Sequence, residues 1–409
     1  MDAVNKWERV SGDSEEAERI YRKSRTFAGD VWFRFHRKPT ALLGFILVAL
    51  LLIFCLVGPS LTPYTYSEQN NKMASIPPVL TVYQAPEEDS WIYITQGLKL
   101  IEVDKEGNLV RQLKKKKDDS SAKQTSFTWD EETLVFLDYS RQPNTILDAE
   151  GNRIETGRKI WNHTYLLGTD QLGRDILTRL MYGTRISLMV AFIAALVNMV
   201  IGIAYGGISG YLGGQTDNIM MRIVDVISTI PLTLYVILIK MCLDDGLLSI
   251  IIALSSVYWV DMARVVRGEM LSLKNQEFVL AARTIGSSDK TILLNHLIPN
   301  AMGPILVTVT MLIPSAIFME AFMSFIGIGI APPMASLGTM CNDATETLRT
   351  NPYQLFLPAL VICIIMFAFN FVGDGLRDAL DPRLRDEEYN ARRMRRLRRA
   401  MRHGKAVTD

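Results

Sequence analysis

The sequence predicts an all-α polytopic membrane protein with six transmembrane helices and a small β-rich insert between the first two helices. Apolar residues make up 49% of the 409 residues and charged residues only 21%, and the apolar residues gather in a few long blocks. Residues 62–165, in contrast, are polar and alternate short β-forming runs with turn residues. This composition excludes a disordered chain, a collagen-like fibre and an ordinary soluble enzyme.

The first predicted span is the uncharged run 41–57, which follows the polar segment 1–39. A bilayer core of about 30 Å requires roughly 20 mostly apolar residues in a helix. We therefore expect a transmembrane helix over 40–58. The segment before it is too long and too mixed in charge for the start of a signal peptide, so we expect the helix to be retained.

Five further spans are predicted within a helical core at 166–382, namely 186–209, 223–243, 247–263, 301–330 and 355–372. The third of the six spans contains Pro231, and the fourth is short and reaches Asp261. The fifth is longer than a span requires and contains Pro304 and Pro314, so a kink or a preceding interfacial turn is expected. A buried core helix would explain any one block, but not six in one chain.

Basic residues predict the orientation, because cytoplasmic segments carry an excess of Lys and Arg. They precede the first span, recur in the loop 264–300 and crowd the tail 383–409. With six spans these three regions share one side, so both termini and the loop should be cytoplasmic and 62–165 should lie outside. The tail could bind anionic lipid or a partner protein.

The insert at 62–165 is expected to form short strands, at 91–94, 98–103 and 133–137. Residues 103–108 resemble 147–152, and the Gly-Asn pair in each can adopt the positive φ of a tight hairpin. The lysines at 114–117, followed by acidic and serine residues, predict an exposed loop. The insert is either a docking platform for an external partner or a decoration without a role in transport.

The sequence lacks the usual signatures of catalysis. It contains no G-x-x-x-x-G-K-[ST], no G-x-S-x-G and no H-E-x-x-H. No two of the four histidines share a helical turn, and the four cysteines have no metal-binding spacing. We therefore predict no catalytic residues and no cofactor or metal site, and the net charge of +1 gives no sign of nucleic-acid binding.

The most informative stretch is 276–299, within the predicted cytoplasmic loop. Small and apolar residues recur there at helical spacing, at Phe278, Ala281, Ala282 and Ile285. Gly286 stands where a helix ends. Ser287 or Ser288 can cap a second helix, which we expect Pro299 to end. The spacing alone fits a partner-docking element and an amphipathic helix on the lipid surface equally well.

Several motifs resemble one family. Ala281-Ala282-x-x-x-Gly286, followed by the motif from His296 to Pro299, resembles the E-A-A-x-x-x-G loop of binding-protein-dependent ABC importer permeases, with Leu280 in place of the usual Glu. Further stretches are similar to oligopeptide and dipeptide permeases of the second ("C") type, at 167–175, 182–188, 324–329 and 373–382. The resemblance covers 30–60 and 165–385 and leaves out the insert.

The resemblance implies a permease subunit of an ATP-driven importer of oligopeptides or dipeptides in the bacterial cytoplasmic membrane. Its implied partners are a second permease, two cytoplasmic ATPase subunits that carry ATP and Mg, and an extracytoplasmic peptide-binding protein. The 264–300 loop would couple to an ATPase, with its small residues allowing close approach. Nickel chelates or another small solute remain alternative cargoes, and a membrane sensor with an external ligand-binding domain remains an alternative class.

Ionisable residues within predicted spans are functional candidates. Glu320 lies in the middle of the fifth span and could line the pathway or bond a neighbouring helix. Asp225 and Asp261 lie near the ends of the third and fourth spans, and Asp261 can pair with Arg264 one turn away. Small residues of the second span predict close helix contact, at Gly202, Gly206 and Gly207.

Overall fold

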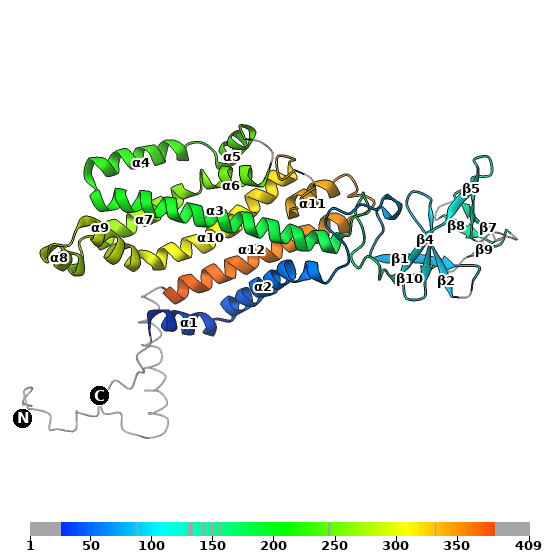
Figure 1. Ribbon diagram of the computed structural model, residues 1–409, viewed down its shortest axis with the longest axis horizontal. Helices are drawn as coiled ribbons and strands as arrows, with labels where there is room; N and C mark the ends of the chain where they lie inside the picture. Colours follow the sequence, from blue (N-terminus) through cyan, green and yellow to red (C-terminus); the bar gives the residue numbers. More distant parts are fainter. Residues whose placement is uncertain are drawn as a thin grey trace, which may run out of the picture.

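The computed structural model describes residues 26–380, except 88, 130–133, 141–143, 149–150, 155–156, 244–245 and 332. The basic tail 383–409 and most of the segment 1–39 lie outside the described residues. The described part is elongated, with a bundle of helices at one end and all the strands at the other (Figure 1).

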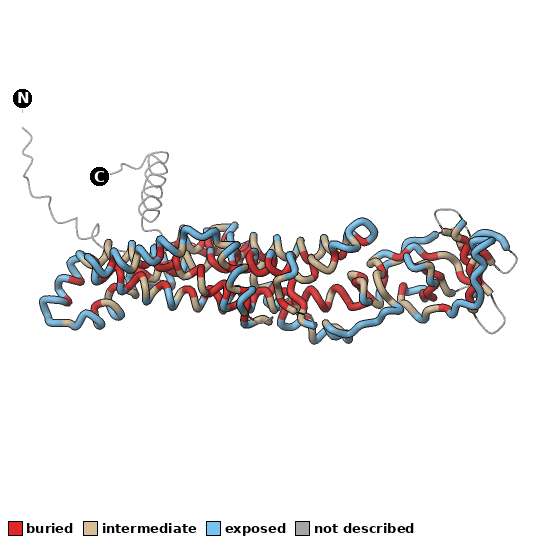
Figure 2. Tube along the Cα trace, turned by 90° about the horizontal axis from the view of Figure 1, so that it is seen from above, coloured by how far each residue is buried: buried red, intermediate tan, exposed pale blue. Residues whose placement is uncertain are grey.

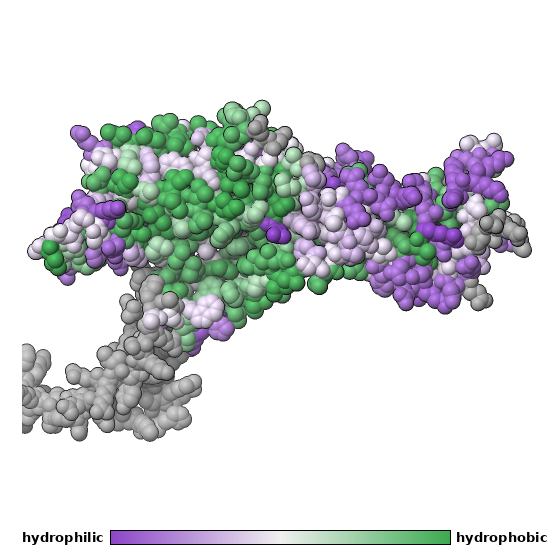
Figure 3. Space-filling view, viewed as in Figure 1, coloured by the Kyte–Doolittle hydropathy of each residue, from purple (hydrophilic) through white to green (hydrophobic). Residues whose placement is uncertain are grey.

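The bundle is built from helices of very different lengths. They are α1 (Phe27–Arg37), α2 (Pro39–Leu56), α3 (Ile176–Leu212), α4 (Gly214–Ser228), α5 (Leu232–Met241), α6 (Leu247–Ser255), α7 (Trp259–Leu273), α8 (Glu277–Thr284), α9 (Asp289–Thr291), α10 (Ile298–Phe325), α11 (Leu337–Ala344) and α12 (Tyr353–Leu380). Five helical stretches are long and apolar enough to cross a membrane, at Pro39–Ser60, Ile176–Leu212, Leu247–Leu273, Asp289–Phe325 and Tyr353–Leu380. They contain most of the first, second, fourth, fifth and sixth predicted spans, and an apolar band covers the bundle (Figure 3).

The third predicted span, 223–243, is not one continuous helix. Its residues are divided between α4 and α5, which meet at an angle of 84°. Pro231 stands immediately before α5, and its ring and missing N–H prevent the α4 ladder from continuing through it. Such a bent pair is a broken span or a re-entrant loop, so the described residues contain five spans, or six if the pair counts as one.

Close packing of α3 on α7 depends on glycine. A Cβ at Gly202 would lie 2.3 Å from the Met262 Cγ, and one at Gly206 would lie 2.2 Å from the Ala263 carbonyl oxygen. Both distances are shorter than any real carbon contact, so the predicted close contact is confirmed at these two positions. Gly207 differs, because a Cβ there would make only an ordinary contact of 3.8 Å with Leu293.

The residues between α2 and α3 form two five-stranded antiparallel sheets, which confirms the predicted β-rich insert. The strands are β1 (Val79–Gln84), β2 (Ser90–Ile94), β3 (Leu100–Asp104), β4 (Leu109–Gln112), β5 (Lys114–Asp119), β6 (Gln124–Thr128), β7 (Leu134–Asp138), β8 (Thr145–Leu147), β9 (Arg153–Ile154) and β10 (Arg158–Trp161). The strand orders are β10-β1-β2-β3-β4 and β5-β6-β7-β8-β9. In the first sheet β10 pairs with β1, which brings the end of the insert back to its start.

The two sequence-related turns form matching hairpins. Gly107 and Gly151 have φ values of 92° and 83°, which only glycine adopts without strain. In each turn an aspartate carboxylate accepts the backbone N–H four residues later, from Asn108 to Asp104 at 2.7 Å and from Asn152 to Asp148 at 2.8 Å. The loop predicted at 114–117 is wrong, because these lysines form the exposed edge strand β5, held by its ladder to β6.

Candidate functional site

The predicted helix–glycine–helix is present at the end of the bundle farthest from the strands (Figure 1). Gly286 follows α8 with a φ of 87°. The N–H of Ser287 donates to the Ala282 carbonyl at 3.1 Å, which satisfies a carbonyl at the helix end. Ser288 then caps α9, since its hydroxyl accepts the N–H of Thr291 at 3.2 Å. The sequence therefore specifies both ends of this turn.

The predicted stripe on α8 divides into two faces. Val279 and Ala282 are buried in the core of the bundle, whereas Phe278 and Ala281 are exposed and Ile285 is 85% exposed. The reason is the helical period of 3.6 residues per turn, which places 279 and 282 to one side of 278, toward the core, and 281 and 285 to its other side, toward the exterior. We call the exposed side, formed by Phe278, Ala281 and Ile285, the α8 tip. The burial map in Figure 2 shows this end of the molecule largely exposed.

The segment after Gly286 differs from the prediction. Pro299 does not end the second helix. The chain passes from α9 through a π-helical turn at Ile292–Leu297 directly into α10, where Pro299 lies in the first turn. Pro299 directly follows the π-helical turn, where the regular i→i−4 hydrogen-bond ladder is already interrupted, and the helix continues through it. His296 lies half-buried in the π-helical turn, and its carbonyl accepts the Asn300 side-chain amide at 2.6 Å.

Polar contacts fix the α8 segment to the end of α3. The Tyr211 hydroxyl donates to the Asp289 carboxylate, and the Arg283 guanidinium lies 5.6 Å from the centre of the Tyr211 ring. The Lys274 ammonium donates to the Gly210 carbonyl at 3.0 Å. These contacts hold the chain on both sides of α8 to the C-terminal end of α3.

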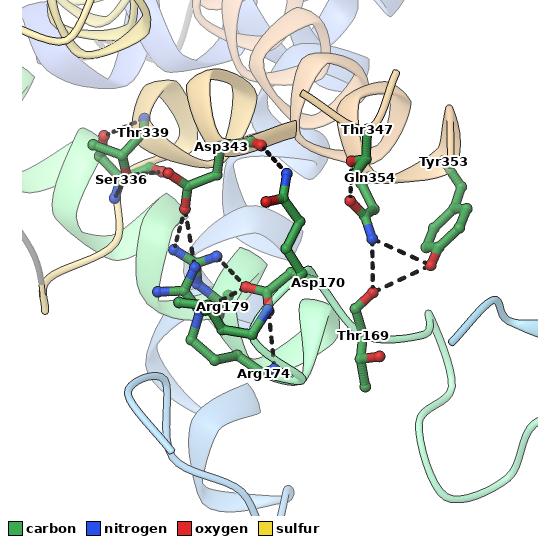
Figure 4. Close-up of polar contacts among 12 residues, drawn as sticks. Thr169, Asp170, Arg174, Arg179, Ser336, Thr339, Asp343, Thr347, Tyr353 and Gln354 are labelled. Carbon is green, nitrogen blue, oxygen red and sulfur yellow. Dashed lines mark hydrogen bonds and ion pairs between the residues drawn. The ribbon is translucent and has the colours of Figure 1, made fainter. Parts of the chain in front are cut away.

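The opposite end of the bundle contains a cluster of four charges, Asp170, Arg174, Arg179 and Asp343, which we call the ion-pair cluster (Figure 4). Arg174 Nε and Arg179 Nη1 donate to Asp170 Oδ2 at 2.6 and 2.5 Å. Asp170 Oδ1 accepts the backbone N–H groups of Leu172 and Arg174, both at 2.9 Å. Asp170 therefore has both oxygens occupied.

Asp343 joins the cluster from α11. Its Oδ2 accepts Arg174 Nη2 at 3.0 Å and Arg179 Nη2 at 3.2 Å. The Asp343 side chain is 41% exposed, against 4% for Arg179. The Gln171 side-chain amide also donates to the Asp343 carbonyl, at 2.8 Å. The cluster thus joins the segment before α3 to the short helix between α10 and α12.

The same region holds the β-rich insert against the bundle. The Tyr353 hydroxyl, at the start of α12, bonds the carbonyls of Ile76 and Thr169 at 3.0 and 3.1 Å. Gln96, in the β2–β3 turn, and Asn351 exchange amide hydrogen bonds at 2.9 and 3.2 Å. The insert is therefore positioned by specific polar contacts to the start of α12 and to the chain just before it.

The remaining candidate residues lie within the bundle. Glu320 is fully buried, and it accepts the hydroxyls of Ser187 at 2.7 Å and Ser324 at 2.9 Å, so it bonds α10 to α3. Asp225 and Asp261 are both exposed beside Arg264, at 3.5 and 3.9 Å. The sequence did not identify the ion-pair cluster, although the motif at 167–175 was noted. The only local signal was the opposite charges of Asp170 and Arg174 at a spacing of four.

Together these features define a polytopic membrane protein with a helix–glycine–helix at one end and a β-rich insert at the other. Residues 199–386 match the family described as "Binding-protein-dependent transport system inner membrane component". Residues 26–86 match "N-terminal TM domain of oligopeptide transport permease C". With the relatives described next, these matches show that the chain belongs to the family of binding-protein-dependent transport system inner membrane components.

Two relatives from Bacillus subtilis (strain 168) align over nearly their whole length. The oligopeptide transport system permease protein OppC is 36% identical over 381 residues, which cover 93% of this chain and 98% of the relative. The dipeptide transport system permease protein DppC is 35% identical over 373 residues, 91% of each chain. Among solved structures, an inward-facing form of the MetNI methionine ABC transporter shows a weak similarity, with a TM-score of 0.42 and 19% identity over 49% of this chain and 96% of that chain.

Proposed function

We propose that this chain is the permease subunit of an ATP-driven importer and forms half of the translocation pathway for oligopeptides or dipeptides. The observation that carries the proposal is the 36% identity to an oligopeptide permease over 93% of this chain. That alignment is too long to omit the insert, so the relative shares at least part of the region between α2 and α3. The names of both relatives favour peptides over nickel chelates and a permease over a membrane sensor.

The proposed topology has six spans in the bacterial cytoplasmic membrane, with α4 and α5 together as the third. Both termini and the α8 tip face the cytoplasm, and the strands lie outside. The positions of α8 and the strands at opposite ends of the bundle support this arrangement (Figure 1). The basic residues of the 264–300 loop support the cytoplasmic side.

The proposed partners are a second homologous permease, two cytoplasmic ATPase subunits and an extracytoplasmic peptide-binding protein. ATP and Mg bind to the ATPase subunits, and this chain carries no cofactor. The α8 tip docks in a groove on one ATPase, because exposed apolar residues at the polar end of a molecule are typical of a protein contact. Gly286 provides the turn that holds the two helices of the loop at their angle.

In the proposed mechanism the chain works as a lever. ATP-driven closure of the ATPase subunits displaces α8, and the contacts through Tyr211 and Lys274 pass that displacement to α3. The π-helical turn before α10 is a second point where the loop meets a span, and such turns often occur at functional sites. The helices then change between two packings, one open to each side of the membrane. Glu320 holds α3 and α10 together during this change.

The proposal is tested by purifying the tagged chain from its native membrane and identifying the co-purifying proteins by mass spectrometry. We expect a second permease, two ATPase subunits and a peptide-binding protein. The recovered complex, reconstituted into liposomes with ATP inside, should accumulate a labelled oligopeptide. Recovery of the chain alone or with signalling proteins, under conditions that preserve other membrane complexes, would contradict the proposal.

A further inference from the structure

A pocket opens beside the ion-pair cluster. Its volume is about 650 Å³, and its charged lining consists of two arginines, Arg174 and Arg179, and three carboxylates, Asp170, Asp343 and Glu346. Sites for small molecules have volumes of roughly 300–1,000 Å³ and a few convergent polar groups. The pocket therefore has the size of a small-ligand site, with two arginines in its wall.

The two aspartates that neutralise these arginines are held very differently. Asp170 accepts four hydrogen bonds through both oxygens, and its side chain is 9% exposed. Asp343 uses a single oxygen, makes longer bonds and reaches the arginines from a separate helix. Among the described residues nothing donates to its second oxygen. Asp343 is therefore the carboxylate that another carboxylate can replace.

One N–H donor of Arg179, at Nε, is not used by the ion-pair cluster. Its Nε is buried and has no hydrogen-bond partner among the described residues. Nε and Nη2 lie on the same edge of a guanidinium, and that edge binds a carboxylate through two parallel hydrogen bonds. Asp343 contacts only Nη2 of this edge. A carboxylate that took the whole edge would gain a hydrogen bond that Asp343 does not make.

We propose that this pocket binds the C-terminal carboxylate of a peptide, which displaces the Asp343 side chain from Arg174 and Arg179 and loosens α11 from the segment before α3, leaving the Gln171 amide on the Asp343 carbonyl as a remaining link. The inference rests on the proposed function, since it names a site for the same substrates on the outer side of the membrane. A peptide is favoured over an acidic residue of a docked protein because the arginines lie in a concave pocket of small-ligand size.

The displacement is local. Gly338 packs α11 tightly on α10, since a Cβ there would lie 2.4 Å from the Ala321 carbonyl oxygen. The chain after α11 is held by Asn351 through its amide pair with Gln96 of the insert. Peptide binding therefore loosens the Asp343 end of α11 between two fixed points, with the Gln171 hydrogen bond to the Asp343 carbonyl still in place, and the insert lies next to this end.

The test measures binding of Ala-Phe as the free acid and as the C-terminal amide to the complex of permeases and ATPases in nanodiscs, without the binding protein. The wild type should bind the acid about tenfold more tightly than the amide, as expected for charge-assisted hydrogen bonds. Asp343→Asn should strengthen binding of the acid by about tenfold, because the competing charge is gone. Arg179→Lys should weaken it, and neither variant should change binding of the amide.

Arg349→Lys is the matched control, since Arg349 is exposed on the loop after α11 and is not among the residues that line the pocket; the affinities of this variant should equal those of the wild type. Equal binding of acid and amide by the wild type would overturn the inference. So would an Asp343→Asn variant that changed affinity for the binding protein and not for the acid. If the complete importer transports peptides but shows either result, only the inference fails. If it assembles and transports no peptide, the proposed function fails.

Discussion

The α8 tip and the ion-pair cluster lie at opposite ends of α3 and are built on opposite principles. Beside the α8 tip, Asp289 and Lys274 bond Tyr211 and Gly210, and the tip itself exposes apolar side chains such as Ile285. At the ion-pair cluster the charges turn inward to one another, and Arg179 is almost completely buried. Apolar contact is non-directional and offers a surface that a partner completes. Buried charges favour one arrangement, because each charge must keep its partner. The ion-pair cluster therefore holds α11 against the segment before α3.

The largest effect on stability should come from Arg179→Met, which removes one charge from the ion-pair cluster. The substitution leaves Asp170 buried with Arg174 as its remaining cationic partner. Removing one member of a buried ion pair typically costs about 3–5 kcal/mol. We expect a clear fall in the apparent unfolding temperature of the purified chain in detergent. Arg349→Met is the exposed control and should unfold like the wild type; equal unfolding of both variants would show that the cluster contributes little stability.

The α8 tip should respond in the opposite way to Ile285→Asp. Because Ile285 is 85% exposed, the substitution should change stability by no more than about 0.5 kcal/mol. Association with the proposed ATPase subunits should nevertheless be lost, because a charge replaces apolar contact area. Co-purification with the tagged chain measures this. Ile285→Leu keeps the apolar surface and should retain the partners, and loss of the ATPases from both variants alike would contradict an apolar docking surface.

The difference between the two ends also explains what the sequence could predict. The α8 segment is encoded locally, since Gly286 and Ser288 fix its turn within a few residues. The ion-pair cluster joins Arg179 to Asp343, which is 164 residues away in the sequence. No local sequence pattern indicates such a pair. The sequence also did not predict that Ala282 is buried while the rest of the stripe is exposed, because the burial of Ala282 depends on helices distant in the sequence.

Whether the spans and strands could be predicted also depended on whether their sequence signal was local. Five of the predicted spans lie on long apolar helices, because roughly 20 apolar residues are a strong local signal. The sharp bend at Pro231 was not predicted, since a proline inside an apolar run fits both a kink and a break. The lysines of β5 looked like a loop because their strand depends on pairing with β6, and side-chain composition does not reveal that ladder.

The amide pair between Gln96 and Asn351 sharpens the comparison, because its strength measures how firmly the insert is held to the end of the bundle that contains the ion-pair cluster. Two reciprocal hydrogen bonds at 2.9 and 3.2 Å should give a coupling energy of about 1 kcal/mol. A double-mutant cycle with Gln96→Ala and Asn351→Ala, followed by chemical unfolding of the chain, measures it. Strictly additive losses would mean that the two side chains are neighbours without a stabilising interaction.

The smallest effect should come from a half-buried charge of the insert, Asp104. Burial alone would raise its pKa, but hydrogen bonds from Asn108 and the turn backbone outweigh burial and lower it. A lowered pKa means that Asp104 stabilises the hairpin above the ordinary value of about 3.9, and that this stability is lost as the pH falls. Since water still screens a half-buried group near the surface, we expect a contribution to stability of only about 0.2–0.5 kcal/mol. The advantage of the wild type over Asp104→Asn in unfolding temperature should therefore persist from pH 6 down to about pH 4 and shrink below it. If Asp104→Asn lowered the unfolding temperature as much as Arg179→Met does, the difference in burial between Asp104 and Arg179 would not determine how much each charge contributes to stability.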